Sequence, residues 1–197
     1  MSALIDRALA ACGLDRTLVA RREGRLDGAE VDRLRSADLL VLGALADRVR
    51  TEEVGVEVRI FTGEPPSSDA PLVVFPEGDR DPTGLELLRE VALARIVGPN
   101  RCRVRIDWTR CGLELAQVSL GFGADELVGR IATKRGLLIG GDELVGVGKK
   151  SRRELAHDVK RRELAGYVRR AGRVPVFVGP DGRPEAFVEA TPILETT

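Results

Sequence analysis

Apolar and charged residues alternate with a period of two in two parts of the chain. Residues 56–61 read Val-Glu-Val-Arg-Ile-Phe, and residues 101–106 read Arg-Cys-Arg-Val-Arg-Ile. Such alternation is typical of a β-strand that buries one face. We therefore predict a strand in each segment, with Cys102, Val104 and Ile106 on the buried face of the second strand. Shorter apolar segments at 72–75 and 136–141 predict two further strands.

Apolar residues at helical spacing lie between these strands. Over 113–120 they recur at i, i+3, i+4 and i+7, which predicts a helix that packs on the strand before it. Gly121 and Gly123 are expected to end that helix, because glycine adopts left-handed backbone conformations without a steric penalty. Four-residue apolar steps predict another helix over 85–97.

The amino-terminal part of the chain has a helical pattern throughout. Residues 3–22 predict one or two short helices broken at Gly13, with a basic end that includes Arg21 and faces solvent. Asp27 and Glu30 have the spacing of a capping box, which would open a helix through residue 34. Ser36 is the expected N-cap of a second helix over 37–50.

The carboxyl-terminal part predicts a long helix followed by a hairpin. Ser151 and Glu154 form a possible capping box for a helix over 151–171. The apolar stripe of this helix changes phase near Lys160–Arg162, so we expect a bend there or contacts on two faces. Segments 174–178 and 185–189 flank the turn sequence Gly-Pro-Asp-Gly at 179–182 and predict a β-hairpin.

Composition restricts the class of protein. The 197 residues have a formal net charge of zero, 43% are apolar and 31% are charged, as in ordinary soluble globular domains. No global field attracts the chain to nucleic acid or membrane. The longest uncharged apolar run, residues 39–46, is far shorter than a membrane span. The start contains an acid and no long apolar stretch, so we expect a cytoplasmic protein.

Cysteine and histidine are too few for most metal chemistry. Cys12, Cys102 and Cys111 form an odd, unclustered set, as expected of reduced thiols. His157 is the single histidine and lies in a charged segment, which argues against a metal centre or a histidine-based catalytic triad. Residues 146–151 contain glycines and lysines but do not satisfy the phosphate-loop spacing.

Ten residues between 112 and 129 form a motif: Gly112, Leu115, Ala116, Gln117, Leu120, Gly123, Ala124, Asp125, Leu127 and Gly129. This motif resembles a pattern from the late part of the barrel in a family of radical S-adenosylmethionine (SAM) enzymes: the aminofutalosine synthase, dehypoxanthine futalosine cyclase and deazaflavin (FO) synthase group. The helix over 39–50 resembles the family's helical lead-in, and residues 169–176, Arg-Arg-Ala-Gly-Arg-Val-Pro-Val, resemble its carboxyl-terminal turn.

The sequence differs from that family in the loop that binds the cofactor. The family's first barrel strand leads into a C-x3-C-x2-C loop that binds a four-iron cluster, whereas no cysteine occurs here between Cys12 and Cys102. Glu126 and Arg130 also replace the residues of the family pattern. We therefore expect no iron–sulfur cluster, no other cofactor or metal, and no radical SAM chemistry from this chain alone.

The resemblance and the periodicity together predict the fold. We expect an α/β protein with a partial (β/α) barrel-like sheet, flanking helices and a carboxyl-terminal β-hairpin. Residues 1–55 would form a helical lead-in, 56–190 the α/β domain, and 191–197 a frayed tail. A partial barrel exposes strand edges, so a second copy of the chain or a full-length radical SAM relative is the expected partner.

Four residues are candidates for binding a ligand. Asp125 and Glu126 follow a helix within the matched segment, where the related enzymes bind substrate; on a solvated loop they would have no such role. Asp107 follows a strand, where α/β folds place functional groups, and could equally cap the next helix. Arg130 could bind a carboxylate or phosphate, or lie on the surface.

A basic interaction surface is a separate possibility. Lys160, Arg161 and Arg162 lie in a region, 149–173, where basic residues exceed acidic ones. The excess could serve RNA, a phosphorylated ligand or an acidic protein, or be a solvated helix face. Nucleic acid is the weaker alternative, because aromatic residues for base stacking are few.

Three functions follow. The leading hypothesis is a cluster-less radical SAM-like protein of menaquinone biosynthesis by the futalosine pathway, acting as a partner or regulatory subunit or binding a futalosine-type ligand. The second is a stand-alone acid–base enzyme on a nucleoside-type substrate, using Asp107, Asp125 and Glu126. The third is a binder of RNA or of an acidic protein through residues 149–173.

Overall fold

A computed structural model describes residues 3–63, 65, 72–73, 83–132 and 159–186. In chain order the elements are α1 (Ala3–Ala11), α2 (Asp15–Arg22), α3 (Gly28–Ser36), α4 (Leu39–Val54), β1 (Glu57–Phe61), β2 (Leu72–Val73), α5 (Gly84–Val97), β3 (Val104–Asp107), α6 (Trp108–Cys111), α7 (Leu113–Ser119), the 3₁₀ turn η1 (Leu120–Phe122), β4 (Glu126–Val128), β5 (Ile131–Ala132), β6 (Val159–Lys160), α8 (Arg161–Arg170) and β7 (Val174–Val178).

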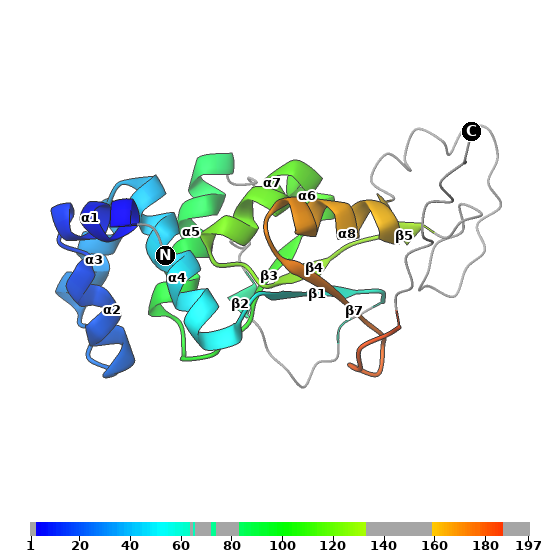
Figure 1. The fold of residues 1–197 in the computed structure, drawn as a ribbon, viewed down its shortest axis with the longest axis horizontal. Coiled ribbons are helices and arrows are strands. Elements are labelled where there is room, and N and C mark those ends of the chain that lie inside the picture. Colours follow the sequence, from blue (N-terminus) through cyan, green and yellow to red (C-terminus); the bar gives the residue numbers. More distant parts are fainter. Residues whose placement is uncertain (1–2, 64, 66–71, 74–82, 133–158, 187–197) are drawn as a thin grey trace.

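Five strands form one parallel sheet in the order β2-β3-β4-β1-β7 (Figure 1). The first strand in the sequence, β1, lies between two later ones, with Arg59 opposite Glu126 on β4 and opposite Val176 on β7. On the other side of β4, Glu126 lies opposite Arg105 on β3. The protein is therefore α/β with a parallel sheet, as the sequence predicts.

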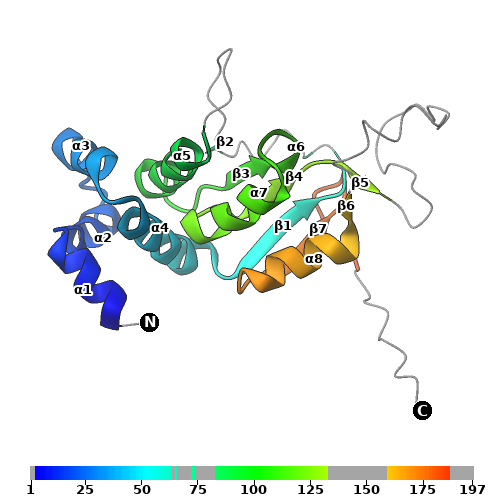
Figure 2. The same cartoon turned by 90° about the horizontal axis from the view of Figure 1, so that it is seen from above.

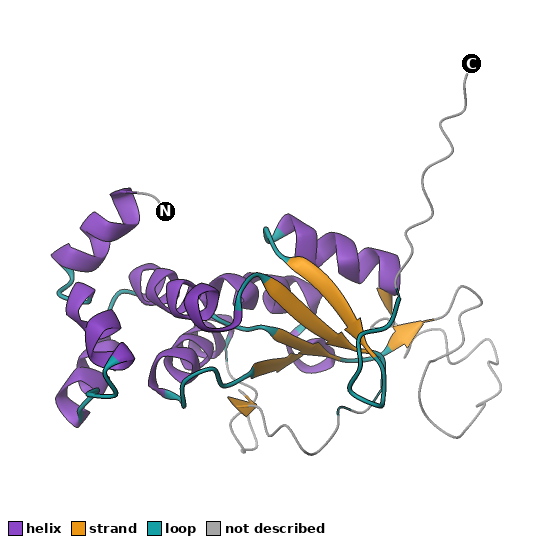
Figure 3. Ribbon diagram, turned by 60° about the horizontal axis from the view of Figure 1, so that its bottom comes forward, coloured by secondary structure: helices purple, strands orange, loops and turns teal. Residues whose placement is uncertain are grey.

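The helices α5, α7 and α8 lie on one side of this sheet (Figures 1 and 2). Side chains alternate between the faces of a strand, and the alternate positions Val58, Ile60, Val104, Ile106 and Leu127 form a buried apolar layer. On β1, β3 and β4 the other set of positions is mainly charged, with Glu57, Arg59, Arg105, Asp107 and Glu126, whereas β7 contributes valines to the same face. Among the described residues no helix covers that second face, which Figure 3 turns toward the reader.

The amino-terminal helices pack beside the sheet and are joined to it through α4 and α5. The break at Gly13 between α1 and α2 is confirmed, and Asp27 accepts a hydrogen bond from the backbone of Glu30 at the start of α3. The predicted cap of the next helix was wrong. Asp38, not Ser36, accepts from the backbone N–H groups of Leu40 and Val41 and opens α4.

Arg21 was also predicted wrongly, since it is buried rather than solvent-facing. Its guanidinium donates to Glu53, at 2.8 and 3.0 Å, and to the carbonyl oxygens of Ile96, Gly98 and Pro99. It ties the end of α5 to α2 and α4. Arginine can be buried in this way because its donors all find acceptors.

The long helix predicted over 151–171 is wrong in its middle. Val159–Lys160 forms the strand β6, which pairs in parallel with β5, and α8 begins only at Arg161. The phase change of the apolar stripe near 160 marks this boundary. The capping box at Ser151 and the strand predicted at 136–141 lie outside the described residues.

The terminal hairpin is described in part. After β7 the chain turns at 179–183, and Glu185 donates its backbone N–H to the carbonyl of Phe177 at 2.8 Å. The return at Pro184 is antiparallel to Val178, as in the predicted hairpin. Residues 187–197, including the predicted tail, lie outside the described part, and the domain limits at 55 and 190 stay predictions. None of the described helices is long and apolar enough to cross a membrane.

Candidate functional site

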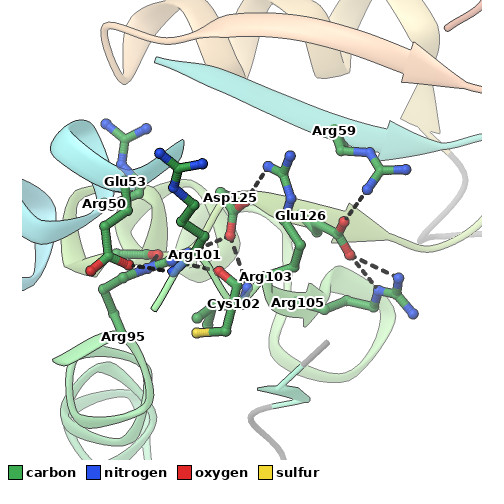
Figure 4. Close-up of polar contacts among 12 residues, drawn as sticks. Arg50, Glu53, Arg59, Arg95, Arg101, Cys102, Arg103, Arg105, Asp125 and Glu126 are labelled. Atoms are coloured by element: carbon green, nitrogen blue, oxygen red, sulfur yellow. Dashed lines mark hydrogen bonds and ion pairs between the residues drawn. The ribbon is translucent and has the colours of Figure 1, made fainter. Parts of the chain in front are cut away.

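A charged cluster lies on the sheet face that no described helix covers. It consists of Arg59 and Phe61 on β1, Arg105 on β3 and Glu126 on β4, and we call it the arginine–glutamate cluster. Figure 4 shows its three charged members. The strand register brings the three charged residues together, because Glu126 lies opposite both Arg59 and Arg105. Parallel strands separated by up to 67 residues in sequence thus form one site.

Both oxygens of the Glu126 carboxylate are occupied. Arg59 donates from Nη1 to Oε1 at 2.9 Å, while Arg105 donates from Nε and Nη2 to Oε2 at 3.0 and 2.8 Å. The Glu126 side chain is 0% exposed, against 16% for Arg59 and 10% for Arg105. The carboxylate is the buried centre of the cluster, and the guanidinium groups lie at its margin.

Phe61 places the cluster towards the carboxyl ends of the strands. The guanidinium carbons of Arg59 and Arg105 lie 5.0 and 4.8 Å from the centre of its ring, within the range of a cation–π interaction. Phe61 is the last residue of β1. The arginine heads therefore lean towards the end of the sheet where open α/β folds bind their ligands.

Burial raises the pKa of Glu126 above its ordinary value of 4.5, and the charges of Arg105 and Arg59 oppose that shift. We expect burial to prevail, because a fully buried carboxylate loses the solvation that stabilises its charge. The charged form of Glu126 is consequently less stable here than in water, despite its two partners.

Asp125 has a different environment from that of its neighbour Glu126. It is fully buried at the amino end of β4, where it accepts from Arg95, from Arg103 at 2.7 Å and from the backbone N–H of Val104 at 2.8 Å. Arg95 in turn donates to the carbonyl oxygens of Gly123 and Cys102. The solvated-loop interpretation of Asp125 and Glu126 is wrong, because both are buried and Glu126 begins a strand.

Asp107 lies at the carboxyl end of β3 and caps α6. Its Oδ1 accepts from the backbone N–H of Thr109 at 2.8 Å and from the Thr109 hydroxyl at 2.6 Å. Among the described residues nothing donates to its Oδ2, and the side chain is half-buried. Capping and ligand binding are thus compatible roles for Asp107.

Arg130 is exposed in the turn after β4, beyond Gly129. Gly129 lies directly against the indole of Trp108; a Cβ on Gly129 would lie 2.2 Å from Cε2 of that ring. Trp108 is itself buried, and its indole N–H has no partner in the described part of the chain. Glycine at 129 is required for this contact between the end of β4 and the start of α6.

The basic interaction surface lies apart from this cluster, at the start of α8. Lys160 and Arg162 are exposed, whereas Arg161 pairs with Glu185 at 2.6 Å and its guanidinium lies over Phe177. Arg161 is therefore committed to packing α8 against β7. Two of the three predicted surface residues remain available to a partner.

Within the described ranges no group of three or more potential ligand side chains could bind a metal ion. Cys12, Cys102 and Cys111 are free thiols. Burial raises the pKa of Cys102 and raises that of Cys111 to about 11, so both thiols are protonated at neutral pH. Neither thiol is poised as a nucleophile or a metal ligand.

Sequence reasoning found Glu126 but missed Arg59, Phe61 and Arg105. The alternation along β1 and β3 predicted that the arginines lie on the face opposite the apolar one. Because arginine is usually exposed, that face was then expected to contact solvent. A signal was present. Parallel sheets are generally covered on both faces, so charged residues on a parallel strand indicate partners on its neighbours.

Comparison with known proteins gives one partial similarity. No protein-family model matches the chain. A stretch of 99 residues is 32% identical to cyclic dehypoxanthine futalosine synthase of Streptomyces coelicolor, which is 50% of this chain and 22% of that enzyme. The chain thus spans well under two thirds of the length of that relative. The similarity is weak and partial, and it indicates a distant relation to an enzyme of the futalosine pathway.

Proposed function

From this distant relation and the geometry of the sheet, we propose that the chain is a cluster-less radical SAM-like protein that binds a futalosine-type nucleoside without radical chemistry, in menaquinone biosynthesis. The observation that supports the proposal is the arginine–glutamate cluster on the sheet face that no described helix covers. A parallel sheet normally has both faces covered, and the charged residues that β1, β3 and β4 place on this face suit a polar ligand better than a packed helix.

Asp107 is the residue we assign to the sugar of that nucleoside. Asp107 and Arg105 are two residues apart on β3, so their side chains share a face and are about 7 Å apart along the strand. Oδ2 of Asp107 accepts from no described residue, and a carboxylate there can accept a hydroxyl proton. The site then offers an acceptor for a ribose and donors for a more distant part of the ligand.

Binding of cyclic dehypoxanthine futalosine to the full chain, measured by isothermal titration calorimetry, tests the proposal. Asp107→Asn is expected to weaken binding about tenfold, because one charged hydrogen bond is lost while the cap on Thr109 can be kept. Asp32→Asn, on the exposed side of α3, is the matched control and should bind as the wild type does. Absence of heat at any nucleoside concentration would refute the ligand assignment.

A second candidate function is that of a subunit, supported by the open sheet. The described sheet ends at β2 and β7, and these two strands do not pair with each other. An open parallel sheet leaves edges for another chain, either a second copy or a full-length radical SAM relative. Light scattering of the purified protein, and its co-purification from native cells, test this candidate; a monomer that retains no such enzyme would exclude it.

A further inference from the structure

The segment from Lys160 to Arg173, which contains α8, has a strong local excess of positive charge. It has six basic residues and a single acid, Glu163. The whole chain has a formal net charge of zero, so the remaining residues contain five more acidic than basic side chains. The positive excess is therefore a property of this segment, and the rest of the chain is acidic on balance.

The helix α8 turns part of this charge towards solvent. Its buried side chains, which face the rest of the fold, are Leu164, Ala165 and Val168. Arg162, Gly166 and Arg170 recur at four-residue steps on the opposite side, which we call the outer face of α8. Both arginines of this face are exposed, and they are about 12 Å apart along the helix axis.

The acids around α8 do not neutralise its outer face. Glu163 accepts a hydrogen bond from the backbone N–H of Lys160 at 3.1 Å and so serves the start of the helix. Two other arginines of the segment pair with acids outside it: Arg161 with Glu185 and Arg173 with Asp47. Arg169, which is also exposed, makes a separate interaction. No described acid forms an ion pair with either arginine of the outer face.

One arginine of the outer face is held in place by its neighbours. The guanidinium carbon of Arg170 lies 4.4 Å from the centre of the Tyr167 ring, within the range of a cation–π interaction. Gly166 leaves room for the same side chain, because a Cβ there would lie 3.4 Å from Nη1 of Arg170. An arginine loses conformational freedom when it binds a partner, and for Arg170 part of that cost is incurred on folding.

We propose that the outer face of α8 binds a short acidic segment of a partner protein, whose carboxylates pair with Arg162 and Arg170. Carboxylates match the forked donors of arginine. An extended segment spans the distance between the two arginines in about four residues. The helix α8 and the arginine–glutamate cluster lie on opposite sides of the sheet, so this surface is separate from the proposed nucleoside site.

Nucleic acid fits this surface less well than an acidic segment does. The ten residues of α8 are about 15 Å long, and a duplex would extend beyond them across a molecule that is otherwise acidic on balance. Tyr167 is the single tyrosine, and Arg170 already lies over its ring, so that face of the ring cannot stack on a base. A short acidic segment meets neither obstacle.

Fluorescence anisotropy of labelled decaglutamate, titrated with the full chain in about 0.05 M salt, tests the proposal. Arg162→Gln and Arg170→Gln should each weaken binding about threefold, and together about tenfold, because exposed ion pairs are individually weak. Tyr167→Leu keeps every charge and should weaken binding about threefold, since Arg170 loses the ring that holds it. If Tyr167→Leu does not fold, the exposed arginine variants decide alone.

The double variant Arg33→Gln/Arg35→Gln, on the exposed side of α3, is the matched control, because it removes the same net charge. It should bind decaglutamate as the wild type does. A double-stranded RNA oligonucleotide, titrated in the same way, tests the other class of partner. The proposal would be overturned by tighter binding of the RNA, by no binding of decaglutamate to the wild type, or by equal affinities of the two double variants.

Discussion

Adjacent acidic residues in this protein have opposite roles. Asp125 is enclosed by two arginines and a backbone N–H at the amino end of β4, whereas Glu126 lies between Arg59 and Arg105 at the centre of the arginine–glutamate cluster. A strand sends successive side chains to opposite faces, and this geometry separates the two carboxylates. A sequence motif that contains both acids therefore combines a structural and a candidate binding residue.

Asp125→Asn is expected to lower the free energy of unfolding by about 3–5 kcal/mol, since it leaves the buried Arg95 without its counter-charge. Urea denaturation at pH 7 measures the change, with Asp32→Asn as the exposed control. A loss below about 1 kcal/mol would mean that the Arg95–Asp125 pair contributes no more to stability than a solvent-exposed salt bridge. In that case Asp125 would not be needed to hold the amino end of β4 in place.

The raised pKa of Cys111, about 11, predicts a slow thiol. Below that pH the protonated thiol predominates, so its reaction with an aromatic disulfide reagent should accelerate only as pH rises towards 11. Cys12 is exposed and is expected to react first at pH 8. Cys12→Ser should remove the fast phase, and a fast phase that survives in this variant would contradict the burial of the other two thiols.

At the scale of the elements, contact between η1 and α4 depends on one glycine. A Cβ at Gly43 would lie 2.6 Å from the ring of Phe122, closer than packed atoms allow. Alanine normally favours a helix over glycine by about 1 kcal/mol, but here the clash should prevail and destabilise the fold by about 1–3 kcal/mol.

Gly28→Ala is the control for Gly43→Ala, because a Cβ at this first residue of α3 meets no atom within 4 Å. It should be neutral or slightly stabilising. Thermal unfolding of the two variants compares them directly. If Gly43→Ala melted at or above the wild-type temperature, the packing of Phe122 against α4 would have to be loose.

The positions of helices and strands could be predicted from the sequence where an element has one apolar face and its ends are set by nearby turn or capping residues. The strand β1, the helix α5 and the break at Gly13 follow from periodicity and turn residues alone. At the boundary between β6 and α8 the phase change of the apolar stripe predicted a bend rather than a strand, because charged residues run through the boundary without a stop signal. Ser36 and Asp38 are both favourable N-cap residues, so the sequence alone could not decide which of them opens α4.

The candidate site was predictable only in part, for a physical reason. Its arginines are buried by partners far away in sequence, and local patterns assign arginine to solvent. Arg21, Arg50, Arg95 and Arg105 are all buried. Arg50 donates to local acceptors, Asp47, Thr51 and the carbonyl of Gly55, but the other three need acceptors that only the tertiary structure brings near. This explains why the acid in the cluster was found and its partners were not.

At the scale of the whole molecule, the two ends of the α/β part depend on each other. Every residue of β1 pairs with one of β7, from Glu57–Val174 to Phe61–Val178, and Thr62 donates to the carbonyl of Val178. Deleting β7 would leave β1 as an edge strand and remove the partner of α8. The sheet therefore cannot be complete without residues near the carboxyl terminus.

A chain ended after Arg173 is expected to lose its cooperative thermal transition and to aggregate, because β1 becomes an exposed edge. A chain ended after Ala186 keeps every described contact of β7 and should retain the transition. Scanning calorimetry of both, at equal concentration, checks the expectation. A sharp transition in the shorter chain would show that β7 is dispensable.

The strand order also has a consequence for biosynthesis. Arg59 leaves the ribosome 67 residues before Glu126, its neighbour on β4, and at typical synthesis rates that interval is about 3 to 13 s. During that interval neither β4 nor β7, the two strands that pair with β1, has been synthesised, and β7 is synthesised last. A growing polypeptide of this design is a natural client for ribosome-associated chaperones, and its yield in a heterologous host should depend on their supply.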